Sequence, residues 1–233
     1  MRAIWSGSIG FGLVNIPIKL YSATEDSSLD LDMLDSKTGD HIKFQRVNER
    51  SGKEVPWEQI VKGYNYHDKY VVLEEEDIAA ASPKKTKIIE IESFVNEADI
   101  DAIYFENPYY VEPEKGGIKA YILLQQALEK SGKVGFGRFV MRMKEHLAII
   151  RPKDDFLMLQ QLRFEEEIRS PDELKVTSDV RISSKELGVA MDLIEEYSSA
   201  FEIDQYKDQF KNELMKIIKA KAGGKKIKAP KMD

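Results

Sequence analysis

Two kinds of hydrophobic periodicity divide this sequence of 233 residues, and the change between them limits the folds that the chain can adopt. As far as residue 175, apolar side chains recur at every second position in short runs, which is typical of β-strands. From Ser183 onward they recur at helical spacing. We therefore expect an α+β protein, with a strand-rich core over residues 1–175, a helical region over 176–222 and a short, basic, disordered tail over 223–233.

The clearest strand pattern covers Leu13–Ala23, where Ile16, Ile18 and Leu20 share one face. Pro17 has no N–H to donate to a neighbouring strand, so this strand is expected at a sheet edge or a bulge. The stretch 48–53 is predicted to be a turn. Further β-rich runs lie at residues 41–47, 70–73, 86–95 and 102–111, with two or three more between 134 and 164.

The helical patterns carry start and stop signals. The run Glu74–Ala81 is predicted to be a short helix closed by Pro83, and a longer one from Ile118 is predicted to end at Ser131–Gly132. Ser183 opens an S-x-x-E capping box in front of an apolar stripe that continues to Tyr197. A second stripe runs through Tyr206, Phe210, Leu214, Ile217 and Ile218.

The glycines at positions 7, 10 and 12 raise the question of a phosphate-binding loop. The stretch G-F-G-L-V-N resembles the start of a dinucleotide fingerprint, but Asn15 occupies the third glycine position and no crossover helix follows. We expect instead that these glycines let a strand bend, with Gly10 and Gly12 at a bulge or a close approach.

The composition removes several function classes. The chain has no cysteine, and its three histidines are far apart, so neither a disulfide framework nor a structural zinc site is expected. No catalytic motif is present, and the acidic run Glu74–Asp77 is interpreted as the start of a helix. We expect no catalytic residue, no metal and no cofactor. The sequence also shows no long apolar run and no signal peptide, which predicts a cytoplasmic protein without a membrane partner.

Charge is distributed unevenly along the chain. The formal net charge is −6, but residues 1–112 carry −9, 113–153 carry +6, 154–213 carry −9 and 214–233 carry +6. Because charges are screened over about 8 Å at physiological salt, a local positive surface can bind a polyanion despite the negative total. The alternative interpretation of each block is an ordinary solvated face.

Basic residues that could track a nucleic-acid backbone occur in three stretches, within residues 43–53, 84–87 and 130–144. Arg138, Arg142 and Lys144 are separated by even numbers of residues, so in one regular strand all three would project from the same face as a row along the phosphates. Lys19, at the end of the first strand, could also reach DNA. The full set of candidate DNA-binding residues is Lys19, Lys43, Arg46, Arg50, Lys53, Lys133, Arg138, Arg142 and Lys144.

Several longer stretches are specific enough to indicate a family. They include M-R-A-I-W-S-G-S-I-G-F-G-L-V-N-I-P-I-K-L-Y-S-A-T, E-V-P-W-E-Q-I-V-K-G-Y-N-Y, D-I-D-A-I-Y-F-E-N-P-Y-Y-V-E-P-E-K-G-G and M-K-E-H-L-A-I-I-R-P. Together they resemble bacterial Ku, the DNA double-strand-break protein of prokaryotic non-homologous end joining. The resemblance runs in order from residue 1 to about residue 222.

The resemblance implies a β-barrel core with flanking helices, and a homodimer that closes into a ring around a double-stranded DNA end without sequence preference. It implies no catalytic activity, a nucleoid-associated location and a partner, the multifunctional ATP-dependent DNA ligase of the pathway, recruited through the helical C-terminal region. Some relatives carry a cysteine pair in the segment matching Arg46–Glu54, which this chain lacks. The lysine-rich extension of many relatives is short here, where it amounts to Lys225, Lys226, Lys228 and Lys231.

On the ring hypothesis, the positive blocks line the hole and the acidic blocks face outward. The aromatic residues Phe105, Tyr109, Tyr110 and Phe136 are candidates for the dimer interface, although core packing is the alternative for each. Two other function classes remain open at this point: a metal-dependent nuclease acting on DNA ends, and a protein-interaction scaffold with no affinity for DNA.

Overall fold

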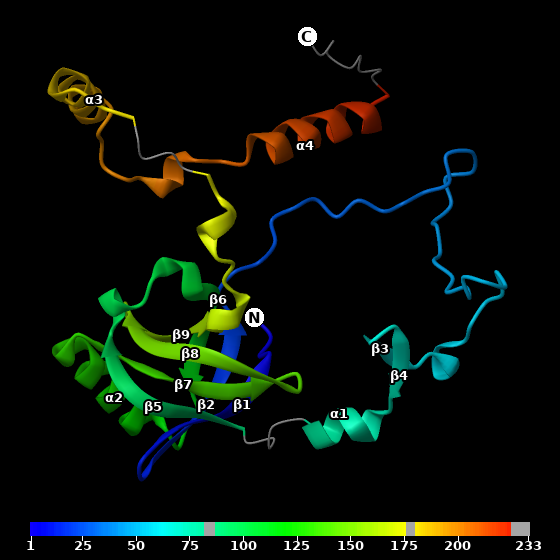
Figure 1. The fold of residues 1–233 in the computed structure, drawn as a ribbon, viewed down its shortest axis with the longest axis horizontal. Coiled ribbons are helices and arrows are strands. Elements are labelled where there is room, and N and C mark those ends of the chain that lie inside the picture. Colours follow the sequence, from blue (N-terminus) through cyan, green and yellow to red (C-terminus); the bar gives the residue numbers. More distant parts are fainter. Residues whose placement is uncertain (82–86, 176–179, 225–233) are drawn as a thin grey trace. The chain divides into compact units, whose positions relative to one another are not determined.

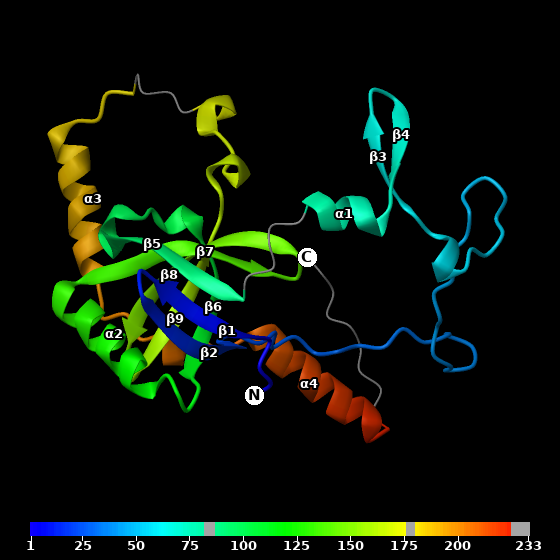
Figure 2. The same ribbon diagram turned by 90° about the horizontal axis from the view of Figure 1, so that it is seen from below.

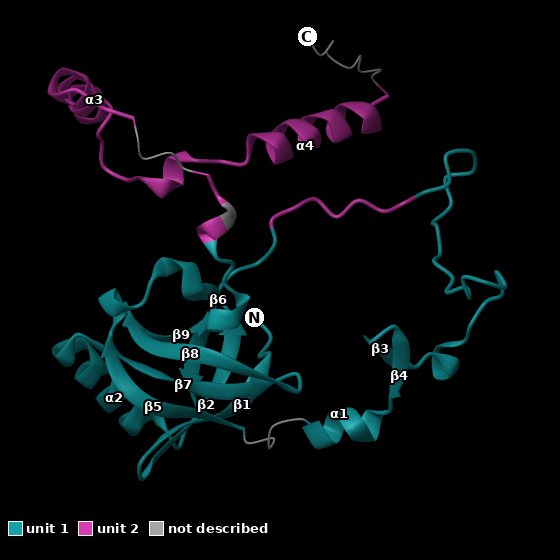
Figure 3. Cartoon of the chain, viewed as in Figure 1, with its two compact units in different colours: residues 1–26, 34–170 teal, residues 27–33, 171–233 magenta. Residues whose placement is uncertain are grey.

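A computed structural model describes residues 1–81, 87–175 and 180–224 (Figure 1). The chain divides into two compact units (Figure 3): residues 1–26 with 34–170, and residues 27–33 with 171–233. The first unit contains every strand of the described residues, and the second contains two longer helices. The predicted α+β class, with a barrel core and flanking helices, is confirmed.

Seven strands of the described residues close into a barrel (Figure 1, Figure 2). Around the barrel the order is β1-β2-β6-β9-β8-β7-β5, and the barrel is closed by β1 pairing in parallel with β5, while the other neighbours are antiparallel. Closure leaves this sheet without an exposed edge. The strands are β1 (Trp5–Phe11), β2 (Val14–Ser22), β5 (Ile88–Asn96), β6 (Phe105–Pro113), β7 (Lys133–Met141), β8 (Lys144–Lys153) and β9 (Phe156–Leu162).

The N-terminal glycines build the β1–β2 hairpin. Gly12 has φ of +54° and is the first of two turn residues, a position that favours glycine in two-residue hairpins. A Cβ atom on Gly10 would lie 2.9 Å from the Cγ2 atom of Ile88 on β5. The predicted close approach at Gly10 is therefore confirmed, while Gly12 forms a turn, and no helix follows to bind a phosphate.

Pro17 lies inside β2, which is hydrogen-bonded on both sides and is not an edge strand. The edge prediction was wrong because it assumed an open sheet. Pro17 is paired with Ser8, whose N–H donates instead to the Lys87 carbonyl at 2.8 Å, so this pair exchanges no hydrogen bonds. The nitrogen of Pro17 faces the β6 side, where pairing begins only at Ile18. The N–H group that proline lacks would therefore face a position where β6 offers no paired residue to accept its hydrogen bond.

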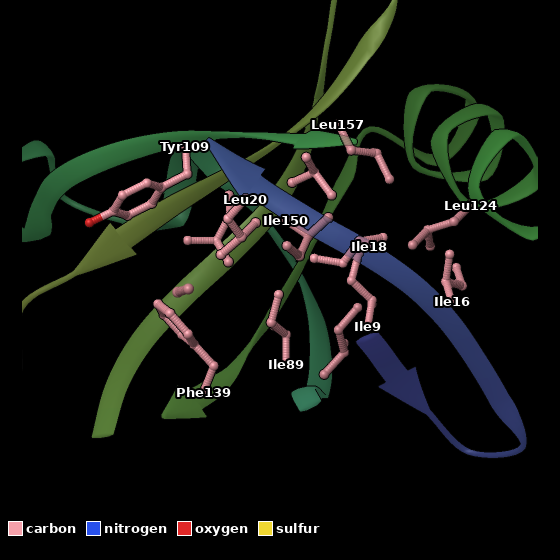
Figure 4. Close-up of a cluster of buried hydrophobic side chains, with 14 of the residues drawn as sticks. Ile9, Ile16, Ile18, Leu20, Ile89, Tyr109, Leu124, Phe139, Ile150 and Leu157 are labelled. Atoms are coloured by element: carbon pink, nitrogen blue, oxygen red, sulfur yellow. The ribbon is translucent and has the colours of Figure 1, made fainter. Parts of the chain in front are cut away.

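The barrel interior is filled by the alternating apolar side chains of its strands (Figure 4). Ile9, Ile18 and Leu20 have no exposed surface, and burying each such side chain stabilises the fold by about 1.5–3 kcal/mol. A second cluster lies around Val134, Ile149 and Leu162, with Phe105 and Phe136 packed against it. These two aromatic residues therefore contribute to the core, as the alternative interpretation held.

Helix α2 (Ile118–Ser131) covers one side of the barrel through Tyr121, Leu124 and Leu128. The hydroxyl of Tyr121 donates to the Val111 carbonyl at 2.8 Å and accepts the Leu157 N–H at 2.6 Å, which ties the helix to β6 and β9. The helix ends at Gly132 in the left-handed conformation, with φ of +64°, as its sequence predicted.

Residues 34–81 form local structure with no buried side chain. The hairpin of β3 (Lys62–Tyr66) and β4 (Lys69–Leu73) is followed by α1 (Glu75–Ala81), which confirms the predicted short helix; its proposed stop, Pro83, lies outside the described residues. The turn at 48–53 is present. The strand predicted at 41–47 was wrong: only the bridges Leu34–His41 and Val47–Glu54 form, because the alternating residues have no neighbouring strand to pair with.

The second unit contains α3 (Ser184–Glu196) and α4 (Gln209–Ala222). The predicted capping box is confirmed: the Glu186 N–H donates to the Ser183 hydroxyl oxygen at 3.3 Å, and the Ser183 N–H donates to the Glu186 carboxylate at 2.8 Å. The predicted disordered tail lies, apart from residues 223 and 224, outside the described residues. Short 3₁₀ turns occur at Trp57–Gln59, Glu97–Asp99, Ala102–Tyr104, Glu165–Glu167, Pro171–Glu173 and Ile203–Gln205.

Candidate nucleic-acid interface

The turn between β7 and β8 carries two of the candidate DNA-binding residues. Arg142 and Met143 form this two-residue turn, with φ of +52° and +66°, and Lys144 is the first residue of β8. Positive φ at two successive residues without a glycine costs about 1–2 kcal/mol per residue. Arg142 and Lys144 are exposed and make no ion pair within the described part of the chain.

The predicted row of Arg138, Arg142 and Lys144 on one strand was wrong. Strand β7 ends at Met141, so the three side chains come from a strand, a turn and the next strand. The Arg138 guanidinium is also engaged: it lies 3.0 Å from the Glu92 carboxylate and 3.5 Å from that of Glu145. Two flanking carboxylates neutralise the charge of Arg138, which leaves the turn as the basic part of this hairpin.

Lys133 and Lys19 lie on the barrel strands and have partners of their own. The Lys133 ammonium donates to the Asn96 side-chain oxygen at 2.8 Å, and the Lys19 ammonium lies 3.8 Å from the Glu114 carboxylate. The Lys19–Glu114 pair is about half exposed, so it is weak and can be exchanged for a phosphate at little cost.

The remaining candidates lie in the segment 41–57. The Arg46 guanidinium stacks over the Trp57 ring, 4.6 Å from its centre, an arrangement that sequence reasoning missed. The side-chain oxygen of Asn48 accepts the N–H groups of Arg50 and Ser51 at 3.1 and 3.0 Å, which shapes the turn. Lys43, Arg50 and Lys53 are exposed on the same segment. The structure thus gathers candidates here and at the β7–β8 turn.

A polar network lies beside the β7–β8 turn and runs from buried Gln161 and Tyr109 through partly buried His146 to exposed Glu106, and sequence reasoning did not find it. Gln161 and His146 lie on the same strand faces as the core residues of β9 and β8, and Gln161 is 7% exposed. The Gln161 amide nitrogen lies 2.6 Å from the Glu106 carboxylate and 2.9 Å from Nδ1 of His146. The Tyr109 hydroxyl donates to the Gln161 amide oxygen at 3.3 Å. We call these four residues the barrel network.

A β-bulge brings Glu106 to this network. Between Phe105 and Pro108, two residues of β6 lie opposite the single residue Gln161 of β9. Such a bulge redirects a side chain, here the Glu106 carboxylate toward Gln161. Burial and the Glu106 carboxylate raise the pKa of the Tyr109 hydroxyl, while the nearby Arg142 guanidinium opposes them. Arg142 is therefore electrostatically close to the network. The alternating run F-L-M-L-Q-Q-L was the available sequence signal, since it places one glutamine inward.

Metal sites and membrane-spanning helices are two further classes of feature. Among the described residues, no group of three or more histidine, cysteine, aspartate or glutamate side chains is arranged to hold a metal ion. The acidic run at Glu74 opens α1, where the Glu74 N–H donates to the Asp77 carboxylate at 2.9 Å. No helix in the described ranges is both long and apolar enough to cross a membrane.

Comparison with known proteins connects this fold to a family. The model of the Ku70/Ku80 β-barrel domain matches residues 10–189 of the chain. The chain belongs to the Ku family. Its curated relatives include the protein named "Non-homologous end joining protein Ku" of Pseudomonas aeruginosa, which is 43% identical over 95% of this chain and 77% of its own length.

Other Ku relatives match just as broadly. The protein of the same name from Archaeoglobus fulgidus is 42% identical, covering 97% of this chain and 90% of its own length. That of Bacillus subtilis is 38% identical, over 97% of this chain and 73% of its own length. The matches extend beyond the barrel, so the Ku resemblance read from the sequence is confirmed for the helical part as well.

Proposed function

We propose that this protein binds ends of double-stranded DNA, without sequence preference, as a ring-shaped homodimer in the repair of double-strand breaks by non-homologous end joining. The observation that carries the proposal is the Ku family match over residues 10–189, together with relatives named for that pathway. The protein acts by binding and holding DNA, with no catalytic residue. Its place in the cell is the cytoplasm, on the nucleoid.

The exposed basic groups support contact with the DNA backbone. Arg142 and Lys144 at the β7–β8 turn, and Arg46, Arg50 and Lys53 in the segment 41–57, present cations without reading base edges. Contacts of this kind fix position on the duplex but carry no sequence information. The other candidates, Lys19, Lys43, Lys133 and Arg138, extend this surface, with Arg138 contributing least because Glu92 and Glu145 already neutralise it.

The β3–β4 hairpin supports a dimer. Every residue of its two strands is exposed, including Tyr64 at 65%, Tyr70 at 76% and Val72 at 53%. A two-stranded hairpin alone is at most marginally stable in water and needs a further apolar surface. A second copy of the chain supplies that surface in the proposed ring, which would require an interface of at least about 1,000 Å².

Encirclement reconciles DNA binding with a net charge of −6. A closed ring leaves DNA only at an end, so moderate attraction to phosphates is enough to hold it. The acidic blocks, placed on the outside, would repel duplex that approaches from the side. Preference for ends then follows from topology.

The experiment that tests the proposal compares linear and covalently closed circular DNA of the same sequence. We expect the protein to bind the linear form, with an affinity that falls steeply as salt rises, and to leave the closed circle unbound. Native mass measurement of the bound species should give two chains per complex. Equal affinity for the closed circle would exclude the ring, and shortening of end-labelled DNA in Mg²⁺ that survives repurification would favour a nuclease.

The helical region supports a role in recruiting the ATP-dependent DNA ligase of the pathway. On α3, apolar side chains remain exposed along one stripe, among them Leu187 at 55% and Ile194 at 67%. Replacing Ile194 by Glu should weaken capture of the purified ligase while leaving DNA binding unchanged. The matched control is Asp192→Asn on the same helix. If the ligase binds the Ile194→Glu chain as well as the native chain, this stripe is not the recruiting surface.

A further inference from the structure

The barrel network and the β7–β8 turn lie at the same end of one hairpin. Met141 is paired with Lys144 next to the turn, and Phe139 is paired with His146 two residues further along each strand. The His146 ring packs against the Phe139 ring, with centres 5.4 Å apart, and Phe139 is only 2% exposed. The orientation of His146 therefore bears directly on how the last residues of the hairpin are held.

Glu106 fixes the orientation of the Gln161 amide. A carboxylate can only accept hydrogen bonds, so the group 2.6 Å from the Glu106 carboxylate must be the NH₂ of Gln161. The amide oxygen then faces the Tyr109 hydroxyl, which donates to it. Reversing the amide would place two acceptors against each other. Gln161 consequently has one orientation in which both of these hydrogen bonds form.

The orientation of Gln161 fixes the tautomer of His146. The same NH₂ group lies 2.9 Å from Nδ1 of His146, so Nδ1 must accept and the proton of the neutral ring must reside on Nε2. A chain of acceptor and donor roles thus runs from Glu106 through Gln161 to a ring that packs against Phe139 beneath the turn.

Packing alone does not account for this arrangement. Gln161 lies on the same face of β9 as Leu157 and Leu159, which belong to the barrel core, and a leucine at 161 would continue that core without a buried amide. The neighbouring turn is also costly, because two residues without glycine have positive φ. Both features lower stability at the place where Arg142 and Lys144 are presented, which indicates a functional gain.

We propose that Glu106, acting through Gln161 and His146, positions the Arg142–Met143 turn so that Arg142 and Lys144 bind the phosphates of duplex DNA. Glu106, Gln161 and His146 are positioning residues and make no contact with DNA themselves. The apolar side chain of Met143, 45% exposed between the two basic residues, then rests against the sugar edge of the groove. This inference rests on the proposed DNA-binding function.

A double-mutant cycle on the full-length protein tests the proposal, with a short blunt duplex as the probe. Glu106→Gln should weaken binding by about fivefold in the native chain but leave affinity nearly unchanged in a chain that already carries Arg142→Gln and Lys144→Gln, because the residues that Glu106 positions are then absent. Glu129→Gln on α2 makes the same change in charge and should leave the affinity unchanged. An equal loss from Glu106→Gln in both backgrounds would overturn the positioning role.

A second variant keeps the test independent of folding defects. Gln161→Leu removes the network while filling its place with an apolar side chain, so we expect unchanged or higher thermal stability together with weaker DNA binding. Native affinity in this variant would contradict the proposal. The ¹⁵N signals of the His146 ring, measured without DNA, should show Nδ1 unprotonated in the native chain and a mixture of tautomers in Gln161→Leu.

Duplex binding by the native chain, the double-mutant cycle and the His146 tautomer together separate the positioning proposal from the proposed DNA-binding function. If the native chain does not bind the duplex, the DNA contact of the turn fails with the proposed function. If the native chain binds duplex and the cycle is additive, the positioning role alone is wrong. If the His146 tautomer is the same in Gln161→Leu as in the native chain, the chain of hydrogen-bond roles that carries the proposal is also wrong.

Discussion

The β7–β8 and β3–β4 hairpins have the same kind of turn but opposite support. Each has a two-residue connection with positive φ at both residues, Arg142–Met143 in one and His67–Asp68 in the other, and neither contains glycine. Strands β7 and β8 each have a second neighbour in the closed barrel and bury one face, whereas β3 and β4 pair only with each other and bury no residue.

The difference teaches that local geometry and stability come from separate sources in this chain. Alternation and cross-strand pairing suffice to define the β3–β4 hairpin, but the free energy that holds the β7–β8 hairpin comes from the barrel core. In the first case the missing burial has to come from a partner, and in the second the barrel core supplies it. Substitutions made in pairs, one in each hairpin, can break or sharpen this contrast.

Truncating an apolar side chain should show the largest difference. Phe139→Ala removes a ring that packs against Trp5 and His146 inside the barrel, and we expect it to lower the free energy of unfolding by about 3–5 kcal/mol. Val71→Ala in β4, where the side chain is 48% exposed, should change it by less than about 0.5 kcal/mol. Urea denaturation at one protein concentration measures both. Equal losses would mean that Val71 is as fully buried in the native assembly as Phe139 is in the barrel.

Adding a methyl group to a strand glycine should give the next largest contrast. A Cβ atom on Gly137 in β7 would lie 1.9 Å from the Glu90 carbonyl oxygen, whereas on Gly63 in β3 the nearest atom would be 3.4 Å away. Gly137→Ala should therefore destabilise the protein by about 1–3 kcal/mol through backbone displacement. Gly63→Ala should be close to neutral. Thermal unfolding of both variants checks this, and a stable Gly137→Ala protein would show that β5 and β7 can separate freely.

Replacing a residue of positive φ by glycine should stabilise both hairpins, but a different measurement should detect the gain in each. Met143→Gly and Asp68→Gly each remove a side chain from a left-handed position, a gain of about 1 kcal/mol to the local hairpin. Only Met143→Gly should raise the global stability, because the β3–β4 hairpin opens without unfolding the barrel. Hydrogen exchange of the Lys62–Tyr66 amides should report the gain in Asp68→Gly. A rise in global stability for Asp68→Gly would tie its hairpin to the core.

The same contrast explains which parts of the fold could be predicted. The strand patterns of β2 and β4–β9 and the caps of α2 and α3 are local signals, and they identified these elements. Strand β1 was missed because Gly7 and Gly10 interrupt its apolar alternation. The run at 41–47 has the alternation but no neighbouring strand, so it stayed a loop. Closure of the barrel through β1 and β5 joins distant segments, which no local pattern encodes.

The sequence predicted which basic residues are candidates for the interface, but not which of them are already paired with carboxylates. Basic residues at 142 and 144 could be identified by their charge, yet only the structure shows that Arg138 lies between two carboxylates. Glu106 had no signal at all, because its role depends on a bulge opposite Gln161 on a strand more than 50 residues away in sequence. The role of a side chain that acts through a spatial neighbour cannot be predicted from the sequence until that neighbour is known.

The smallest effect concerns α3, which resembles the β3–β4 hairpin in having no buried side chain. Hydrogen bonds from the Ser183 hydroxyl and N–H lower the pKa of the Glu186 carboxyl below its ordinary value of 4.5. A lowered pKa means that the capping box stabilises the helix above the ordinary pKa and is lost as the pH falls through the lowered one. Amide exchange in the first turn of α3 should therefore quicken on acidification below pH 4.5, and Ser183→Ala should abolish that dependence. The barrel amides of β8 should not respond to the same substitution, because their protection depends on the core; a parallel response would show that α3 is coupled to the barrel.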